Sequence, residues 1–238
     1  MSRTAGILGG LGPAATVYFM DMLLRMTAAK TDQEHIDMLV MSRATTPDRT
    51  AYILGQSDDN PLPVMVEDAR RLEQMGADFI VIPCNTAHYF YSEVQYAVTV
   101  PVINILEVTA DAVAETVSDL RKVGILATEG TISAGAYQTE LAKRGLDFCI
   151  PTADDQDVIT GIIYKQVKAG LSVNIEAFTA VVGRMRAAGC DAIILGCTEL
   201  SLINRDHGPF GADVFDSLEL LAKTTVRLSG KPLKGVTL

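Results

Sequence analysis

Gly76-Ala-Asp-Phe-Ile-Val-Ile-Pro-Cys84-Asn-Thr86 has a close counterpart later in the chain, Gly189-Cys-Asp-Ala-Ile-Ile-Leu-Gly-Cys197-Thr-Glu199. Each stretch runs from a Gly-x-Asp turn through apolar residues to a cysteine eight positions after the glycine. The similarity extends upstream, because Gly6-Ile-Leu-Gly9 begins 78 residues before Cys84 and Gly124-Ile-Leu-Ala127 begins 73 residues before Cys197. Repeated segments at similar spacing predict a duplicated structural unit. The alternative is that an α/β protein simply reuses such turns before its strands.

The duplication would end one strand of each half on a thiol, at Cys84 and at Cys197. Ligands of open parallel sheets bind beyond the carboxyl ends of the strands. Two halves that face each other at those ends would place the thiols on opposite sides of one cleft. Such a pair suits a two-base proton transfer, in which one group removes a proton and the other returns one. Both cysteines are therefore candidate catalytic residues.

Short apolar runs alternate with amphipathic stretches, a pattern typical of strand–helix repeats and parallel sheets. The expected strands are 4–8, 36–41, 79–82, 102–105, 123–127, 147–150 and 192–195, with a short eighth at 214–215. The expected helices include 14–28, 63–75, 86–97, 106–117, 134–144, 158–168, 175–188 and 217–228, with Asp157 and Asn174 as caps. We predict an α/β fold of two pseudo-symmetric domains, each a mainly parallel sheet flanked by helices, with the site in the cleft between them. The predicted domains are 1–104 plus 211–238, which hold Cys84, and 105–210, which hold Cys197.

Composition narrows the possible function classes. The chain of 238 residues is 48% hydrophobic and 21% charged, as expected of a globular protein with a substantial core. Its net charge of −9, from 20 Lys and Arg against 29 Asp and Glu, argues against nucleic-acid binding. No apolar run has the length of a membrane span and the N-terminus lacks a signal-peptide layout, so we expect a cytoplasmic protein. The four cysteines form no CxxC pair, which disfavours a metal cluster or a disulfide framework.

A glycine-rich turn, Gly9-Gly-Leu-Gly-Pro13, follows the first expected strand and opens a helix. It loosely fits the dinucleotide-binding pattern, but Pro13 interrupts the motif and the next strand ends at Ser42-Arg43 rather than on an acid. The other interpretations are a tight turn and a backbone cradle for a small anion. We keep Gly10 as a candidate substrate contact and predict no cofactor.

Polar residues follow both cysteines. The dipole of a helix favours a thiolate at its N-terminus, and the amides of Asn85 and Thr86 could cradle a carboxylate there. After the second cysteine, Glu199 could receive an amino group or tune the thiol, or simply occupy the first turn of a helix. His88, one turn after the first cysteine, allows Cys–His nucleophilic catalysis, although packing is an equal alternative for a lone histidine.

Three further positions concern the carboxylates and hydrogen bonds of a substrate. Arg49, in the polar segment Thr45-Thr-Pro-Asp-Arg49, could grip a carboxylate with two hydrogen bonds or be a solvated loop residue. Thr128 follows the fifth expected strand, where a hydroxyl donor and a helix-capping role are alternatives. Lys165 lies in the expected helix 158–168, where a solvated face is the default interpretation.

Together these motifs resemble the signatures of the cofactor-independent aspartate/glutamate racemase superfamily, and most of all its aspartate racemase branch. The segments that carry the resemblance are Gly6-Ile-Leu-Gly-Gly-Leu-Gly-Pro13, Ile82-Pro-Cys-Asn-Thr-Ala-His88 and Leu195-Gly-Cys-Thr-Glu-Leu200. The resemblance implies Cys84 and Cys197 as the two acid/base residues and, often, a homodimer. It further implies substrate contacts from these residues: Asn85, Thr86, Thr128, Thr198, Glu199 and, for the carboxylates, Arg49 and Lys165.

The activity that the resemblance implies is racemisation of an acidic amino acid, aspartate or glutamate, without pyridoxal phosphate. The two cysteines would exchange roles as base and acid according to the enantiomer bound, and oriented donors would stabilise the developing dianion. Two alternatives stay open. One is a maleate-type isomerase of the same superfamily, in which Cys84 attacks a substrate carbon. The other is a non-catalytic amino-acid-binding protein.

Overall fold

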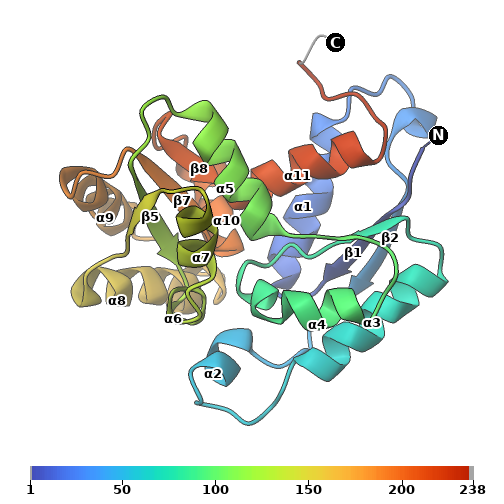
Figure 1. Ribbon diagram of the computed structural model, residues 1–238, viewed down its shortest axis with the longest axis horizontal. Coiled ribbons are helices and arrows are strands. Elements are labelled where there is room, and N and C mark those ends of the chain that lie inside the picture. The colour runs from blue at the N-terminus through green and yellow to red at the C-terminus, as the bar shows by residue number, and fades with distance from the viewer. Residues whose placement is uncertain (1, 236–238) are drawn as a thin grey trace.

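The computed structural model of the protein describes residues 2–235 and contains two parallel sheets of four strands each (Figure 1). The first sheet has the order β2-β1-β3-β4 and the second the order β6-β5-β7-β8. The strands are β1 (Ala5–Gly9), β2 (Met38–Ser42), β3 (Phe79–Val81), β4 (Val102–Ile103), β5 (Lys122–Ala127), β6 (Asp147–Cys149), β7 (Ala192–Gly196) and β8 (Val214–Asp216). The eight expected strands are all present, and the matching order of the two sheets confirms the duplicated unit.

The repeated Gly-x-Asp turns have the same role in both halves. The carboxylate of Asp78 accepts a hydrogen bond of 2.7 Å from the amide of Thr4, just before β1. Asp191 accepts two hydrogen bonds of 3.0 Å, from the amides of Arg121 and Lys122 at the start of β5. Each aspartate thus ties the strand that leads to a cysteine to the amino end of the central strand of its sheet.

Helices connect the strands and cover the sheets. The first group is α1 (Pro13–Met26), η1 (Asp32–Glu34), α2 (Arg49–Ile53), α3 (Leu62–Gln74), the 3-10 turn η2 (Thr86–Phe90) and α4 (Tyr91–Tyr96). The second group is α5 (Ile105–Thr116), α6 (Glu129–Ser133), α7 (Ala136–Lys143), α8 (Ala153–Gly161), the π-helical turn η3 (Ile162–Val167), α9 (Ile175–Ala187), α10 (Thr198–His207) and α11 (Ser217–Leu228). Across residues 2–235, none of the helices has the length and apolar character to cross a membrane.

The helix predicted as 158–168 differs most from expectation. It begins earlier, as α8, where the hydroxyl of Thr152 caps it by accepting a hydrogen bond from a first-turn amide. Asp157, the predicted cap, therefore lies inside the helix. From Ile162 the helix widens into the π-helical turn η3, a form that is rare and frequent at functional sites.

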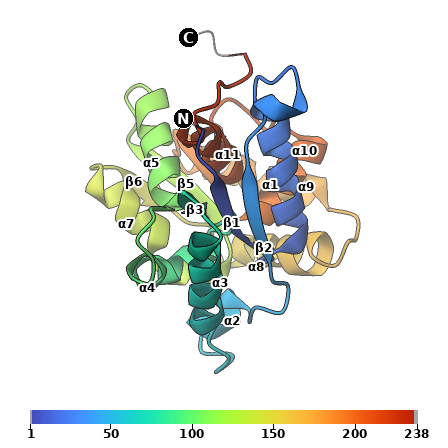
Figure 2. The same cartoon turned by 90° about the vertical axis from the view of Figure 1, so that its right-hand side faces the viewer.

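Three apolar clusters arrange the sheets and helices in layers. Neighbouring residues of a strand point to opposite faces, so on β1 Ile7 joins the central cluster and Leu8 the outer cluster of the first half. The central cluster contains residues of both sheets and of α1, α5 and α11, such as Phe19 and Leu218. The outer clusters place α3 against the first sheet and α8 and α9 against the second. One continuous core therefore joins the halves, and α1 and α3 cover opposite faces of the first sheet (Figure 2).

The predicted domain boundary at residue 211 needs correction. Strand β8 is hydrogen-bonded to β7, with residues 214–216 opposite residues 193–195, so it completes the second sheet and does not belong to the first half. After β8, α11 packs against both α1 and α5 and bridges the halves (Figure 1). The tail then returns to the first half, where Leu233 pairs with Thr27.

Candidate active site

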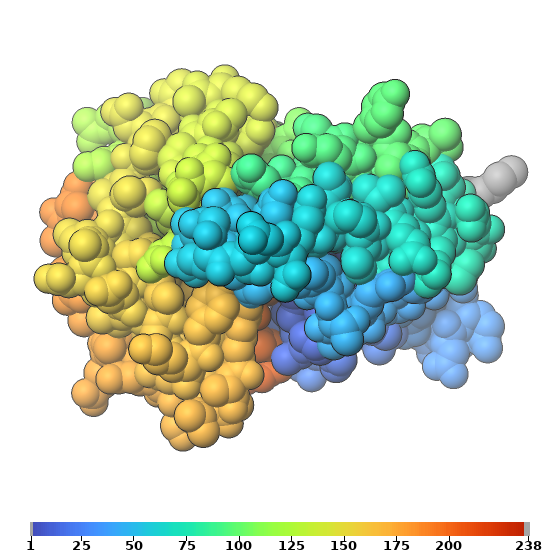
Figure 3. Space-filling model, turned by 90° about the horizontal axis from the view of Figure 1, so that it is seen from below, coloured from blue at the N-terminus to red at the C-terminus, as the bar shows by residue number. Residues whose placement is uncertain are grey.

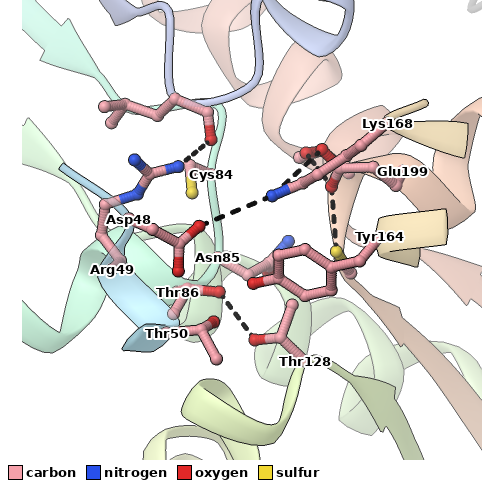
Figure 4. A pocket seen from close by; sticks show the side chains of 13 residues that line it. Asp48, Arg49, Thr50, Cys84, Asn85, Thr86, Thr128, Tyr164, Lys168 and Glu199 are labelled. Carbon is pink, nitrogen blue, oxygen red and sulfur yellow. Dashed lines mark hydrogen bonds and ion pairs between the residues drawn. The ribbon is translucent and has the colours of Figure 1, made fainter. Parts of the chain in front are cut away.

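A small cavity lies where the carboxyl ends of both sheets meet. It contains Cys84 and Cys197, whose exposed fractions are 6% and 4%. The other lining residues come from both halves: Leu11, Asp48, Arg49, Thr50, Asn85, Thr86, Thr128, Tyr164, Lys168, Thr198 and Glu199. Figure 4 shows Cys84 on the side of Arg49, with Lys168 and Glu199 across from them. The structure thus brings both thiols into one hollow, sheltered from water, which we call the inner cavity.

Cys84 follows β3 on a segment that is hydrogen-bonded to the second half. Among the cavity residues drawn in Figure 4, none hydrogen-bonds to its thiol. The next residue, Asn85, accepts a hydrogen bond of 2.6 Å from the hydroxyl of Tyr137 and donates one of 3.0 Å to Ser217. Ser217 in turn donates to the carbonyl of Leu195 at 2.8 Å. This buried network links the halves through the side chain of a predicted substrate contact.

Three threonine hydroxyls form a closed cluster beside the same segment. Thr86, from the first half, lies 2.9 Å from both Thr128 and Thr131, from the second, and those two are 3.0 Å apart. Thr128 also caps α6 by accepting a hydrogen bond from the amide of Thr131. Thr86 and Thr128 both line the inner cavity. Thr128 is therefore a helix cap and a cavity hydroxyl at once.

The imidazole of His88 contacts the backbone of Cys84 rather than its thiol. Nδ1 lies 2.9 Å from the carbonyl oxygen of Cys84, and Nε2 accepts a hydrogen bond of 3.2 Å from the amide of Ile105. The carbonyl oxygen of Ile103 also lies 3.4 Å from Nε2, but the two shorter contacts assign the proton to Nδ1, which donates to the carbonyl of Cys84. Burial lowers the pKa of His88 to about 4, so the ring is neutral near pH 7. This arrangement gives no support to a Cys–His nucleophile.

Cys197 has a different environment at the start of α10. Its thiol donates a hydrogen bond of 3.0 Å to the carboxylate of Glu199, which also accepts one of 3.2 Å from the hydroxyl of Thr198. Burial, followed by the negative charge and the hydrogen bond of Glu199, raises the pKa of Cys197 well above its ordinary value. The thiol of Cys197 therefore keeps its proton near neutral pH.

Lys168 connects the two walls of the inner cavity. Its ammonium lies 3.9 Å from the carboxylate of Asp48 in the first half, 4.0 Å from that of Glu199 in the second, and 4.3 Å from the ring centre of Tyr164. Burial acts against the charged form, but Glu199 and the neighbouring groups outweigh it and raise the pKa of Lys168. The cavity therefore holds a permanent cation between two acids.

Lys165, the predicted carboxylate ligand, is exposed and does not line the inner cavity. That role was implied by the family resemblance, whereas the sequence pattern alone indicated a solvated helix face. In η3 the amide of Lys168 donates to the carbonyl of Ile163, five residues back, and of the two lysines it is Lys168 that lines the cavity. Lys168 therefore stands where Lys165 was expected.

Arg49 is buried at the first position of α2, with Asp48 as the cap of that helix. Its Nη2 donates a hydrogen bond of 2.6 Å to the carbonyl of Leu11, and its Nη1 donates to those of Pro47 (2.8 Å) and Thr46 (3.3 Å). Its Nε is buried without a partner among the described residues. Because a guanidinium has five N–H donors, Arg49 has donors beyond those that these three carbonyls accept.

The glycine-rich turn lines a wider outer hollow beside the inner cavity, and the two share Leu11, Asp48, Arg49, Lys168 and Glu199. A Cβ at Gly10, whose φ is 82°, would collide with the backbone of Arg43. A Cβ at Gly12 would lie 2.8 Å from the carboxylate of Glu199. Close packing therefore explains both glycines, and Gly10, a predicted substrate contact, lies outside the inner cavity.

Helix α2 covers the inner cavity from the first half. It packs against α6, and Figure 3 shows the cyan segment that includes α2 lying across the boundary between the halves. The contact needs a glycine at position 130, because a Cβ on Gly130 would lie 2.9 Å from the Cα of Thr50. This cover carries Arg49 and Thr50 into the cavity lining.

Comparison with known families agrees with this geometry. The family model described as Asp/Glu/hydantoin racemase matches residues 8–225, a range that includes both cysteine segments and every lining residue of the inner cavity. The chain belongs to the Asp/Glu/hydantoin racemase family. Its enzyme class is therefore amino-acid racemase of the Asp/Glu type, and the family predicted from the cysteine motifs is confirmed.

Individual relatives are similar to this racemase over nearly its full length. The aspartate racemase of Picrophilus torridus is 30% identical with a TM-score of 0.83, and the match covers 98% of this chain and 96% of that one. An aspartate racemase homologue from Pyrococcus horikoshii OT3 is 25% identical with a TM-score of 0.77, covering 97% and 100%. The broad specificity amino-acid racemase RacX of Bacillus subtilis strain 168 is 30% identical over 227 residues, 93% of this chain and 96% of that protein. These matches confirm the predicted fold.

Several lining residues of the racemase cavity escaped prediction: Leu11, Asp48, Thr50, Tyr164 and Lys168. Asp48 directly precedes Arg49, a predicted site residue, and this proximity is the signal that could have identified Asp48. Tyr164 and Lys168 lie in a stretch whose sequence looks like an ordinary solvated helix, so no signal in the sequence indicated that they belong to the site. Within residues 2–235, no three His, Cys, Asp or Glu side chains are grouped so that they could hold a metal ion.

Proposed function

We propose that the protein racemises an acidic amino acid, aspartate or glutamate, by proton transfer between Cys84 and Cys197 and without pyridoxal phosphate. The observation that carries this proposal is the burial of two thiols, one from each half of a duplicated fold, in a single cavity. Membership of the racemase family and similarity to an aspartate racemase over 98% of the chain support it.

In one direction of the reaction, Cys84 is the base and Cys197 is the acid. Glu199 keeps the proton on Cys197 through its charge and its hydrogen bond. The Cys84 thiolate removes the α-proton, and Cys197 gives its proton to the opposite face of the α-carbon. One C–H bond breaks and one forms, and the two sulfurs exchange protonation states. The roles reverse for the other enantiomer, so the pair titrates as coupled groups.

Two cations hold the carboxylates of the substrate. Arg49 supplies a guanidinium from the first half, with Nε unpartnered among the described residues, and Lys168 supplies an ammonium from the second. Removal of the α-proton adds a second negative charge beside the α-carboxylate. Preoriented cations in a water-poor cavity stabilise that charge more than they stabilise the substrate. Glu199 receives the α-ammonium group.

The remaining substrate contacts are hydroxyl and amide groups of the inner cavity. Thr86, Thr128 and Thr198 offer hydroxyls that can rotate towards a ligand. Asn85 has a second amide hydrogen beyond the one donated to Ser217. Gly10 contacts the substrate at the outer hollow as it enters.

We further propose that the enzyme is a homodimer, as the family resemblance implies. Light scattering on the purified protein would then give twice the mass of one chain. A mass equal to that of a single chain would contradict this assignment without affecting the proposed chemistry.

Proton NMR in D₂O tests the reaction itself. The reduced protein is incubated without added cofactor with each enantiomer of aspartate and of glutamate. Loss of the α-proton signal, together with appearance of the opposite enantiomer in chiral analysis, is the expected result and identifies the substrate. Absence of exchange with all four compounds would contradict the proposal.

A further inference from the structure

His88 is a buried polar residue of the Cys84 segment that the proposed reaction does not use. Its exposed fraction is 5%, and its ring stacks on Tyr91 with 6.2 Å between the ring centres. A buried imidazole is costly unless its nitrogens are hydrogen-bonded. Both nitrogens are, one to the carbonyl of Cys84 and the other to the amide of Ile105. Hydrogen bonds at both nitrogens thus hold the ring in place.

These two partners belong to different parts of the molecule. Cys84 follows strand β3 of the first sheet, whereas Ile105 begins α5, which packs against α7 and α11. The first amides of a helix have no partner inside it. Asn104 accepts hydrogen bonds from the next two amides of α5, and His88 accepts the one from Ile105. The ring therefore spans from the backbone of a cysteine in the active site to the start of the second half.

The second half has a counterpart at the matching position. Ser201, four residues after Cys197 as His88 is four residues after Cys84, donates a hydrogen bond of 2.6 Å to Asp216. Asp216 is the cap of α11, which follows β8 as α5 follows β4. In both halves, the fourth residue after the cysteine fastens the cysteine segment to the corner between the last strand and the next helix.

We propose that His88 is a positioning residue, which sets the reach of the Cys84 thiol towards the α-carbon by tying the carbonyl of Cys84 to the first amide of α5. This inference rests on the proposed two-cysteine reaction. His88 acts through the backbone of Cys84, since its ring does not contact the thiol. The neutral ring keeps Nε2 free to accept a hydrogen bond near pH 7, consistent with its low pKa. A displacement of about 1 Å at a reacting group can cost about 100-fold in rate.

Four variants test this role. His88→Asn keeps a donor near the position of Nδ1 and loses the acceptor for Ile105, whereas His88→Gln reaches the position of Nε2 and loses the donor to Cys84. Ser201→Ala removes the counterpart in the second half. His207→Gln changes an exposed histidine at the end of α10 and is the matched control. The kcat/KM of each is measured with both enantiomers of the substrate found by NMR, with hydrogen or deuterium at the α-carbon.

Isotope effects distinguish positioning from general damage. The two enantiomers have equal free energy, so kcat/KM must fall by the same factor in both directions. A misplaced Cys84 makes its own proton transfer slower. The isotope effect on kcat/KM then rises in the direction in which Cys84 removes the deuteron and falls in the other.

We expect both His88 variants to lose about 10-fold to 100-fold in kcat/KM, with unequal isotope effects in the two directions. Ser201→Ala should give the opposite inequality, because it disturbs the Cys197 segment, and His207→Gln should match the wild type. Full activity of either His88 variant, or a loss with the ratio of isotope effects unchanged, would overturn the positioning role. If one His88 variant does not fold, the other decides. A wild-type protein that racemises neither substrate would overturn the proposed function first, which is a distinct result in the same assay.

Discussion

The two cysteines occupy equivalent places in a repeat, yet their surroundings differ. Side chains after Cys84 are bonded to the second half or to backbone, as Asn85 is to Tyr137. Two residues after Cys197, the carboxylate of Glu199 accepts a hydrogen bond from the thiol itself. Both segments are therefore held in place, and in the second one a carboxylate also controls the proton of the thiol. A duplicated scaffold can thus preserve the placement of two groups while giving each a separate chemical role.

Replacement of either cysteine by serine should produce the largest effect. An alcohol is a much weaker acid than a thiol, so proton transfer at that face is lost and racemisation falls by about 10²-fold to 10⁴-fold. Each single variant should still exchange the α-hydrogen of one enantiomer with solvent, because the remaining cysteine can return the proton to the same face. Cys84→Ser and Cys197→Ser should therefore exchange opposite enantiomers. Full racemisation by either variant would contradict the two-base reaction.

Lys168 should have the next largest effect, because it is the cation that joins both walls of the cavity. A hydrogen bond to a charged group contributes about 1.5–3 kcal/mol, so Lys168→Met should raise KM for the acidic substrate by about 10-fold to 100-fold. Lys165→Met is the matched control, since Lys165 lies three residues away and outside the cavity. Steady-state kinetics of both variants would contradict the corrected assignment if Lys165→Met raised KM more than Lys168→Met.

Glu199→Gln tests the difference between the two thiols. The carboxylate disfavours the Cys197 thiolate through its charge, so a neutral amide should lower the pKa of Cys197 and increase the thiolate fraction at a given pH. Ultraviolet thiolate absorbance, titrated in a Cys84→Ser background, measures this change. An upward shift or no shift would show that Glu199 does not control the proton of Cys197.

Tyr137→Phe should have the smallest effect on catalysis and a clear effect on stability. It leaves the side-chain oxygen of Asn85 buried without the 2.6 Å hydrogen bond, which costs about 1–3 kcal/mol. Denaturant unfolding should show this loss, with kcat little changed because Ser217 still holds the amide of Asn85. Tyr96→Phe, at a side chain with an exposed fraction of 94%, should leave the free energy of unfolding unchanged. If the two variants were equally stable, the hydrogen bond between Tyr137 and Asn85 would not contribute to the stability of the contact between the halves.

The features that were predicted correctly are those that short stretches of sequence determine. The strands follow from apolar runs, and the placement of both cysteines follows from the repeat. Lys168 could not be found this way, because its stretch has the pattern of an ordinary solvated helix and nothing local distinguishes it from Lys165. The link between Asn85 and Tyr137 joins residues 52 positions apart and exists only in the folded chain. Strand β8 has three residues, too few for a pattern to show which sheet it joins.

Alkylation of each cysteine as a function of pH tests the division of roles most directly. The two residues are similarly buried, with exposed fractions of 6% for Cys84 and 4% for Cys197. Iodoacetamide labelling of the native protein, read by peptide mass spectrometry, gives the rate at each site. We predict that Cys84 is labelled first and that Cys197 reacts only well above about pH 8.5, the ordinary pKa of a thiol. Labelling of Cys197 near neutral pH, as fast as that of Cys84, would contradict an acid role for Cys197 in the resting enzyme.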